Sequence, residues 1–222
     1  MNTQRDDTWT GQFVKNGLKK HNSVESVELL GPKLIRIHRK THDSVVVATT
    51  AVERLDAAAF RAAINGAALH PDYVVNIPAE SIVLGDAIQL ARQHGVGVGQ
   101  FKDLMGALVS SDVSRHLSSD IRYVEENLPQ HERVKSIEPL ADRHYRIERH
   151  DFPPVQVVFI HEYDLTVDHV RMAKQRYRSF SAIVITNPNG HATGEAERLA
   201  ATMNCRIYIW KTFYDALNKR VV

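Results

Sequence analysis

Hydrophobic and polar side chains alternate in two consecutive segments near the start of each half of the chain. Residues 24–30 (VESVELL) and 34–40 (LIRIHRK) alternate in the first half, and residues 134–140 (VKSIEPL) and 145–150 (YRIERH) alternate in the second. A period of two is typical of a β-strand that buries one face. Glycine and proline at 31–32 punctuate a turn. The pattern therefore predicts two successive strands in each half.

Uninterrupted apolar runs follow and are typical of central strands buried on both faces. These runs are 44–50 (SVVVATT), 73–78 (YVVNIP), 156–162 (QVVFIHE) and 182–188 (AIVITNP). Helical segments are predicted at 9–20, 54–68, 85–95, 101–108, 114–128, 166–179, 193–204 and 212–219, and short strands at 96–100 and 205–210. Each half is thus predicted to be α-β-β-β-α-β-α-β-α, an α/β fold. A meander followed by parallel crossovers gives a mixed sheet with helices on both faces.

The second half aligns with the first over most of its length, which indicates an internal duplication. Residues 13–30 align with 123–140 at an offset of 110, 44–56 with 156–168 at 112, 73–78 with 183–188 at 110, and 85–108 with 194–217 at 109. Any two α/β domains share apolar rhythms, but matches such as Gly85 with Gly194, in order and nearly ungapped, favour duplication. We predict domains at 1–110 and 118–222, a polar linker near 109–117, and a pseudo-twofold axis, as in a homodimer fused into one chain.

Composition and charge limit the classes of function. The 222 residues carry a formal net charge of +2, so no large sequence-independent attraction to nucleic acid or an anionic membrane is built in. The single cysteine, Cys205, cannot form an intramolecular disulfide. No apolar run approaches the roughly 18 residues of a membrane span, and the N-terminus lacks a secretory signal pattern. These features predict a cytoplasmic protein that does not engage a membrane.

The α-β-β-β-α-β order, and above all residues 157–210, carry a resemblance to a known family. This segment contains an apolar strand, a helix, a second strand ending in ITN, a helix with an Ala-x-x-Leu-Ala pattern and a short strand. It resembles the restriction-endonuclease-like family, the PD-(D/E)XK nucleases, in their Mrr-type branch. The resemblance implies an Asp on the second strand and a Glu/Gln-x-Lys on the third. Two carboxylates then hold a divalent metal beside the scissile phosphate, and the lysine activates the attacking water.

Both halves depart from this catalytic pattern. In the second half Asp151 lies near the position of the Asp, but the third strand, 159–164 (FIHEYD), has no lysine. In the first half Asp43 is displaced, and 47–51 (VATTA) has neither a carboxylate nor a lysine. The resemblance therefore implies a degenerate, non-catalytic pair with no cofactor.

An active second half is the alternative, with Asp151, His161 and Glu162 as catalytic residues and Mg²⁺ or Mn²⁺ as the cofactor. Asp151, Glu162 and Asp164 are the candidate metal ligands, because carboxylate oxygens suit these cations. The competing interpretation is a polar strand end that enters a loop. Consecutive strand residues point to opposite faces, so His161 and Glu162 cannot both face one site from a regular strand.

Basic side chains at matching positions are candidate nucleic-acid contacts, because arginine binds phosphate well. The candidates are Arg36, Arg39, Arg146 and Arg149 on the predicted strands, and Arg171, Lys174, Arg176 and Arg178 on a predicted helix. The alternative is a solvated strand and helix surface with local salt bridges. The loop at 187–195 leads into a helix N-terminus, which offers backbone N–H groups to an anion, but it lacks nucleotide-binding glycine spacing.

Three functions follow from these patterns. We expect a non-catalytic, pseudo-nuclease binding module that acts around DNA or RNA, in mobile-element or defence systems as the resemblance implies. The first alternative is a divalent-metal-dependent nuclease that uses the second half. The second alternative is a scaffold subunit that binds a protein partner and no nucleic acid, which the near-zero net charge favours.

Overall fold

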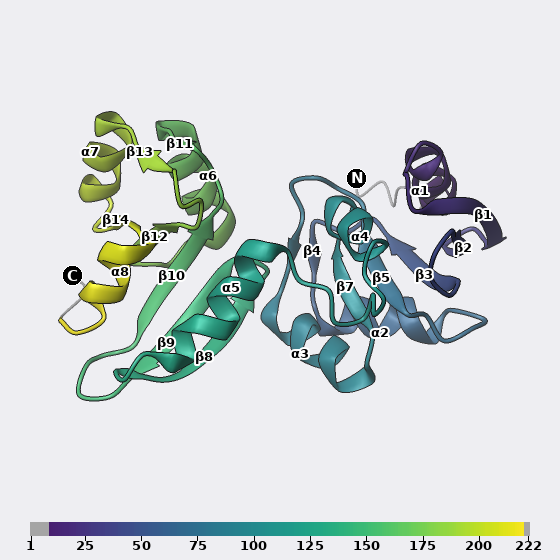
Figure 1. The fold of residues 1–222 in the computed structure, drawn as a ribbon, viewed down its shortest axis with the longest axis horizontal. Helices are drawn as coiled ribbons and strands as arrows, with labels where there is room; N and C mark the ends of the chain where they lie inside the picture. The colour runs from purple at the N-terminus through teal and green to yellow at the C-terminus, as the bar shows by residue number, and fades with distance from the viewer. Residues whose placement is uncertain (1–8, 220–222) are drawn as a thin grey trace, which may run out of the picture. The chain divides into compact units, whose positions relative to one another are not determined.

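The chain forms two units of similar architecture (Figure 1). The structure, a computed structural model, describes residues 9–219. The chain divides into two compact units, Met1–Ser118 and Ser119–Val222. Each unit contains one five-stranded mixed sheet with its own helices. The predicted α/β fold with two duplicated units is confirmed.

The elements follow the same order in both units. The first unit contains α1 (Thr10–Leu18), β1 (Val24–Gly31), β2 (Leu34–Arg39), β3 (Val45–Thr50), β4 (Arg54–Leu55), α2 (Ala57–Asn65), β5 (Tyr73–Asn76), β6 (Ile82–Val83), α3 (Gly85–His94), β7 (Gly97–Gln100) and α4 (Phe101–Ala107). The second contains α5 (Ser119–Asn127), η2 (Leu128–Gln130), β8 (Val134–Ala141), β9 (His144–Arg149), β10 (Val155–Ile160), β11 (Asp164–Leu165), α6 (Val167–Tyr177), β12 (Ala182–Ile185), β13 (His191–Ala192), α7 (Gly194–Thr202), β14 (Arg206–Ile209) and α8 (Trp210–Ala216). This is the predicted order, with an added two-residue strand before the second and third helix of each unit.

The two sheets share their strand order and directions. The orders are β1-β2-β3-β5-β7 and β8-β9-β10-β12-β14. The first three strands of each sheet are antiparallel neighbours, and the last three are parallel. The parallel strands therefore all end at one edge, which we call the carboxyl edge. The turn before β9 lies at this edge too, because His144 pairs with Val158.

The pairing register corrects two of the predicted offsets. β3 and β10 start at Val45 and Val155, an offset of 110, whereas the sequence alignment placed 112 there. β5 and β12 start at Tyr73 and Ala182, an offset of 109 instead of 110. Both pairs are runs of apolar residues, which look alike when slid by one or two positions. The hydrogen bonds to neighbouring strands, and not the apolar rhythm, determine their register.

Helices cover both faces of each sheet, as predicted. In the first unit α1 and α4 pack on one face, where Leu18 and Leu104 are fully buried, and α2 and α3 pack on the other, around Phe60. In the second unit α6 and α7 cover one face. On its other face Phe213 of α8 packs against Phe159 of β10, with ring centroids 6.4 Å apart.

The helix predicted at 114–128 begins later, at Ser119. The preceding residues follow the first unit instead, because Val113 is 4% exposed and belongs to the core under α1 and α4. Ser114 also donates from its backbone N–H and its hydroxyl to the Asp112 carboxylate, a local arrangement that competes with helix formation. The segment predicted as a polar linker therefore packs against the core of the first unit through Val113.

A buried arginine ties the last helix of each unit to its sheet. Arg39 donates from Nε to the Asp43 carbonyl at 2.7 Å and from Nη1 to the Ser110 carbonyl at 2.5 Å. Arg149 likewise donates from Nη2 to the Pro153 carbonyl at 2.8 Å and from Nη1 to the Lys219 carbonyl at 2.7 Å. We call each set of bonds an arginine clasp. Burial lowers the pKa of both guanidinium groups, and the carbonyl oxygens satisfy their donors.

Replacing Arg149 by leucine should lower the free energy of unfolding by about 2–4 kcal/mol, because buried carbonyls lose their donors. Urea unfolding followed by circular dichroism measures this change. The matched control is Arg146→Leu, three positions earlier on β9, where the side chain is 43% exposed and paired with Glu148. The control should cost less than about 1 kcal/mol. Equal costs for the two variants would contradict the structural role of the clasp.

Candidate functional site

The carboxylates predicted to share a metal lie at opposite ends of β10. Asp151 lies in the turn before the strand, whereas Glu162 and Asp164 follow its last residue, Ile160. A six-residue strand spans about 17 Å, so Asp151 and Glu162 cannot bind one ion. Asp151 is instead paired with Arg133 at 3.0 Å, and Asp164 with His191 at 3.1 Å. Among residues 9–219, no group of three or more His, Cys, Asp or Glu side chains is placed to hold a metal ion.

The structure instead brings four polar side chains together at the carboxyl edge of the second unit. Asp120 lies at the start of α5, and its side chain is only 7% exposed. Arg143, in the turn between β8 and β9, donates to Asp120 from Nη1 at 2.6 Å and from Nη2 at 3.4 Å. Thr186, directly after β12, donates its hydroxyl to Asp120 Oδ2 at 3.1 Å. His161, directly after β10, completes this set, which we call the edge cluster.

Hydrogen-bond directions within the edge cluster determine how His161 presents its ring. The Thr186 hydroxyl has one proton, and the Asp120 carboxylate accepts it. The contact of 3.1 Å between His161 Nδ1 and Thr186 Oγ1 therefore requires Nδ1 to be the donor. In the neutral ring this leaves Nε2 as the acceptor. The His161 side chain is 47% exposed, so the cluster orients one basic nitrogen in a half-exposed ring.

The first unit has a counterpart of the edge cluster that lacks its carboxylate and its imidazole. Thr10 and Lys33 stand at the positions of Asp120 and Arg143, and Ala51 and Ile77 at those of His161 and Thr186. The backbone supports this match, because the bonds Thr49 N to Lys33 O and Ile77 N to Thr50 O recur as Phe159 N to Arg143 O and Thr186 N to Ile160 O. In place of the ion pair, the Thr10 and Thr49 hydroxyls bond at 2.7 Å. The Asp120–Arg143 ion pair of the second unit is thus not repeated between the equivalent residues of the first, because Thr10 carries no charge.

The basic residues predicted to contact nucleic acid differ in how available they are. Arg39 and Arg149 are each 7% exposed and form the arginine clasps, which gives them a structural role. Arg36 is paired with Glu28 at 3.2 Å and Arg146 with Glu148 at 2.6 Å. These four positions therefore match between the repeats for reasons of folding and local ion pairing.

Helix α6 carries the remaining basic candidates. Arg171 is paired with Asp168 at 3.2 Å, and both side chains are exposed. Lys174 lies 4.9 Å from the centre of the Phe180 ring, and Arg176 lies 5.9 Å from that of Tyr177. Arg178 is exposed just after the helix. Residues 166–181 contain these four cations and one acidic residue, so α6 is the basic element of the second unit.

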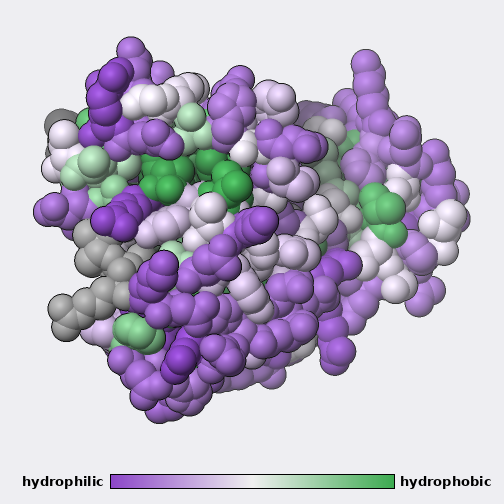
Figure 2. All heavy atoms as spheres, turned by 60° about the vertical axis from the view of Figure 1, so that its left-hand side comes forward, coloured by the Kyte–Doolittle hydropathy of each residue, from purple (hydrophilic) through white to green (hydrophobic). Residues whose placement is uncertain are grey.

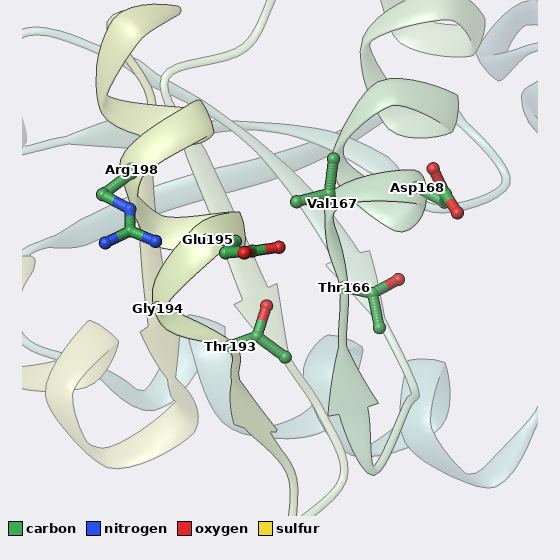
Figure 3. A pocket seen from close by; sticks show the side chains of 7 residues that line it. All are labelled: Thr166, Val167, Asp168, Thr193, Gly194, Glu195 and Arg198. Carbon is green, nitrogen blue, oxygen red and sulfur yellow. The ribbon is translucent and has the colours of Figure 1, made fainter.

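A cavity of about 560 Å³ lies between the N-terminal ends of α6 and α7. Thr166, Val167 and Asp168 line it from α6, and Thr193, Gly194, Glu195 and Arg198 line it from α7. Figure 3 shows the Glu195 carboxylate pointing into the gap toward α6 and Asp168 pointing away from it. Thr193 already accepts a bond from Ala196 N at 3.2 Å. The Glu195 carboxylate thus places negative charge beside the N-terminal ends of α6 and α7, where an anion would otherwise be attracted. The cavity therefore does not favour the anion binding that was considered for the loop at residues 187–195.

His144 is a buried polar group next to this face of the sheet. It lies at the start of β9, 6% exposed, with its ring 5.6 Å from that of Tyr177 and 6.3 Å from that of Phe180. Burial lowers the pKa of His144 to about 4 from the usual 6.5, against opposing hydrogen bonds to Gln156 and Ser179. The folded unit therefore holds this imidazole neutral.

Comparisons with protein-family models, with curated proteins and with solved structures gave no match. Within residues 9–219, none of the helices has the length and apolar character needed to cross a membrane. The function of the edge cluster is therefore argued from its geometry alone.

Sequence patterns pointed to His161 but not to Asp120, Arg143 or Thr186. These three residues belong to no catalytic or binding motif of the sequence. The three residues are up to 66 positions apart in the sequence. Only the position of α5 against the sheet, which no local pattern specifies, brings them together.

Replacing Arg143 by methionine should cost about 3 kcal/mol of unfolding free energy, because the nearly buried Asp120 carboxylate loses its charged partner. Asp120→Asn combined with Arg143→Met should cost less than the two single changes added together. A double-mutant cycle by urea unfolding measures this coupling. Additive costs would mean that the ion pair contributes nothing to folding.

The stability of the second unit should fall as the pH drops from about 6.5 to about 4, partly because of His144. With a folded-state pKa below the unfolded value, protonation favours the unfolded chain, so stability is complete above pH 6.5 and is lost toward pH 4. His144→Leu, which introduces the residue of the equivalent Leu34, should reduce this acid sensitivity. Melting temperatures of both proteins across this pH range provide the measurement. Parallel curves would exclude His144 as a source.

Proposed function

We propose that this chain is a pair of restriction-endonuclease-like units that bind nucleic acid without cutting it. The observation that carries the proposal is the Asp120–Arg143 pair. A carboxylate at the carboxyl edge, where open α/β sheets bind ligands, has a guanidinium at 2.6 Å. Arg143 thus supplies the positive charge that a divalent metal would otherwise bring to Asp120.

The separation of the other carboxylates supports the same proposal. A metal-dependent nuclease of this type needs two carboxylates on one ion, and Asp151 and Glu162 lie at opposite ends of β10. The residues present do not fit a Mg²⁺ or Mn²⁺ site, so their geometry provides no basis for a hydrolytic step. Binding remains as the activity for which this edge is suited.

Helix α6 is the proposed phosphate-binding element. It carries Arg171, Lys174 and Arg176, with Arg178 directly after it. Phosphate contacts determine most of the affinity for nucleic acid and require no particular base sequence. The context of mobile elements or defence belongs to this proposal through the family resemblance alone, and the cytoplasmic location through the sequence features that predicted it.

The test is fluorescence anisotropy of labelled duplex DNA, single-stranded DNA and RNA at two salt concentrations with Mn²⁺ present, followed by inspection of the probes. We expect salt-sensitive binding and intact probes. Replacing both Arg171 and Arg178 by glutamine should lower the slope of log affinity against log salt by about 2. Arg36→Gln is the matched control, because this arginine lies on β2 of the first unit and not on the proposed phosphate-binding helix.

The other outcomes separate the two alternatives. Cleaved probes, with cleavage lost in Asp151→Ala, would establish the nuclease and refute the proposal. No binding of any probe at low salt would favour a scaffold that binds a protein partner. Exposed apolar side chains such as Leu29 and Ile209, 41% and 43% exposed, give that second candidate a specific basis.

A further inference from the structure

A pair of aromatic rings lies at equivalent positions in each unit, between its first and its last helix. In the first unit Phe13 of α1 contacts Phe101 of α4, with ring centroids 5.8 Å apart and an interplanar angle of 65°. In the second, Tyr123 of α5 contacts Trp210 of α8 at 5.0 Å and 65°. The members are 110 and 109 positions apart, the same offsets that relate the two sheets. We call these two contacts the aromatic pairs.

Both aromatic pairs reach the surface. Phe13 is 44% exposed and Tyr123 is 48% exposed. Trp9 adds a third ring in the first unit, 40% exposed and 5.5 Å from Phe13. Phe101 lies against Gly17 of α1, where a Cβ atom would lie 2.5 Å from the ring. Figure 2 shows a mostly hydrophilic surface on the face it presents. Exposed aromatic side chains that contact one another, as Trp9 and Phe13 do, are typical of an interaction surface.

Each aromatic pair stands at the carboxyl edge of its sheet. Phe101 and Trp210 directly follow the last residues of β7 and β14. In the second unit Tyr123 lies about one helical turn after Asp120 on α5. Trp210 also lies 6.5 Å from Phe159, two positions before His161. The second aromatic pair therefore adjoins the edge cluster.

A lysine follows each aromatic pair, and the first pair has the more basic surroundings. Lys102 and Lys211, both exposed, directly follow Phe101 and Trp210. Residues 9–24, which contain α1, include three lysines and no Asp or Glu, whereas α5 carries three acidic residues and one arginine. Exposed rings beside ammonium groups complement a nucleotide, because the base stacks on the ring and the phosphate meets the cation. A duplex keeps its bases stacked on one another, so only an unpaired base can reach such rings.

We propose that the aromatic pairs are stacking surfaces for the unpaired bases of single-stranded DNA or RNA. This inference rests on the proposed nucleic-acid binding and names its substrate class. Stacking requires only the flat face of a base, so the preference is for strandedness and not for a sequence. Lys102 and Lys211 beside the rings then supply phosphate contacts, and the rings supply discrimination against duplex.

The two tryptophans of the chain, Trp9 and Trp210, report on this proposal directly. Each belongs to the ring contacts of one unit. Unlabelled oligothymidylate should quench tryptophan fluorescence at low salt, whereas an abasic deoxyribose-phosphate strand of equal length should not. In Trp9→Phe the remaining quenching reports the second aromatic pair alone.

Leucine substitutions separate ring stacking from apolar bulk. Phe13→Leu and Tyr123→Leu should each weaken oligothymidylate binding about tenfold, with duplex binding unchanged. Tyr163→Leu is the matched control, because Tyr163 is 59% exposed but contacts His191 and neither aromatic pair. The control should leave both affinities unchanged.

Three outcomes would overturn the inference. Equal, unquenched binding of oligothymidylate, abasic strand and duplex would reject base stacking and leave the proposed function intact. No binding of any probe would reject both. Self-association in size-exclusion chromatography that Tyr123→Leu abolishes would assign the aromatic pairs to an interface between copies of the chain.

Discussion

Each unit depends on a buried guanidinium that joins the end of its second strand to the chain after its last helix. Arg39 and Arg149 make equivalent bonds, to the carbonyls of Asp43 and Ser110 and of Pro153 and Lys219. A planar guanidinium with five donors in a fixed fork can reach two separated carbonyls at once, whereas the ammonium of lysine concentrates its three donors at one point. These bonds hold α4 and α8 on the sheet face that α1 and α5 also cover. The position of the last helix, and with it the aromatic pair, follows from the clasp.

The two carboxyl edges show how one scaffold supports different chemistry. The backbone bonds around Lys33 and Arg143 are the same, yet one edge holds a pair of threonine hydroxyls and the other an ion pair. The Thr10 and Thr49 hydroxyls are neutral and bond to each other, whereas the Asp120 carboxylate accepts bonds from a cation and from a hydroxyl. Charge at an edge is costly to keep unless it is paired. In the second unit Arg143 meets this requirement for Asp120, whereas Thr10 at the equivalent position has no carboxylate to pair.

Much of the fold could be predicted from the sequence because local patterns determine it. The alternating strands, the buried runs and the amphipathic helices each show a period, and the repeat shows every element twice. The offsets that relate β3 to β10 and β5 to β12 were not predicted correctly, because runs such as VVVA look the same when displaced. The true start of α5 was missed because Val113 belongs to the first unit's core. Arg39 and Arg149 were noticed as a matched pair, but the sequence could not show that main-chain carbonyls are their partners.

Helix α5 links the two candidate surfaces of the second unit. Asp120 and Tyr123 lie about one turn apart on it, so a movement of α5 that changes the ion pair also moves the exposed ring. Arg143 holds Asp120 from the turn before β9, and Trp210 holds Tyr123 from the start of α8. The helix is thus held by an ionic contact from the β9 end of the strand order and by a ring contact from the β14 end. In the first unit the ionic contact is replaced by the Thr10–Thr49 bond while the ring contact persists. The aromatic pair does not require the ion pair, which is why the two surfaces can have separate roles in one domain.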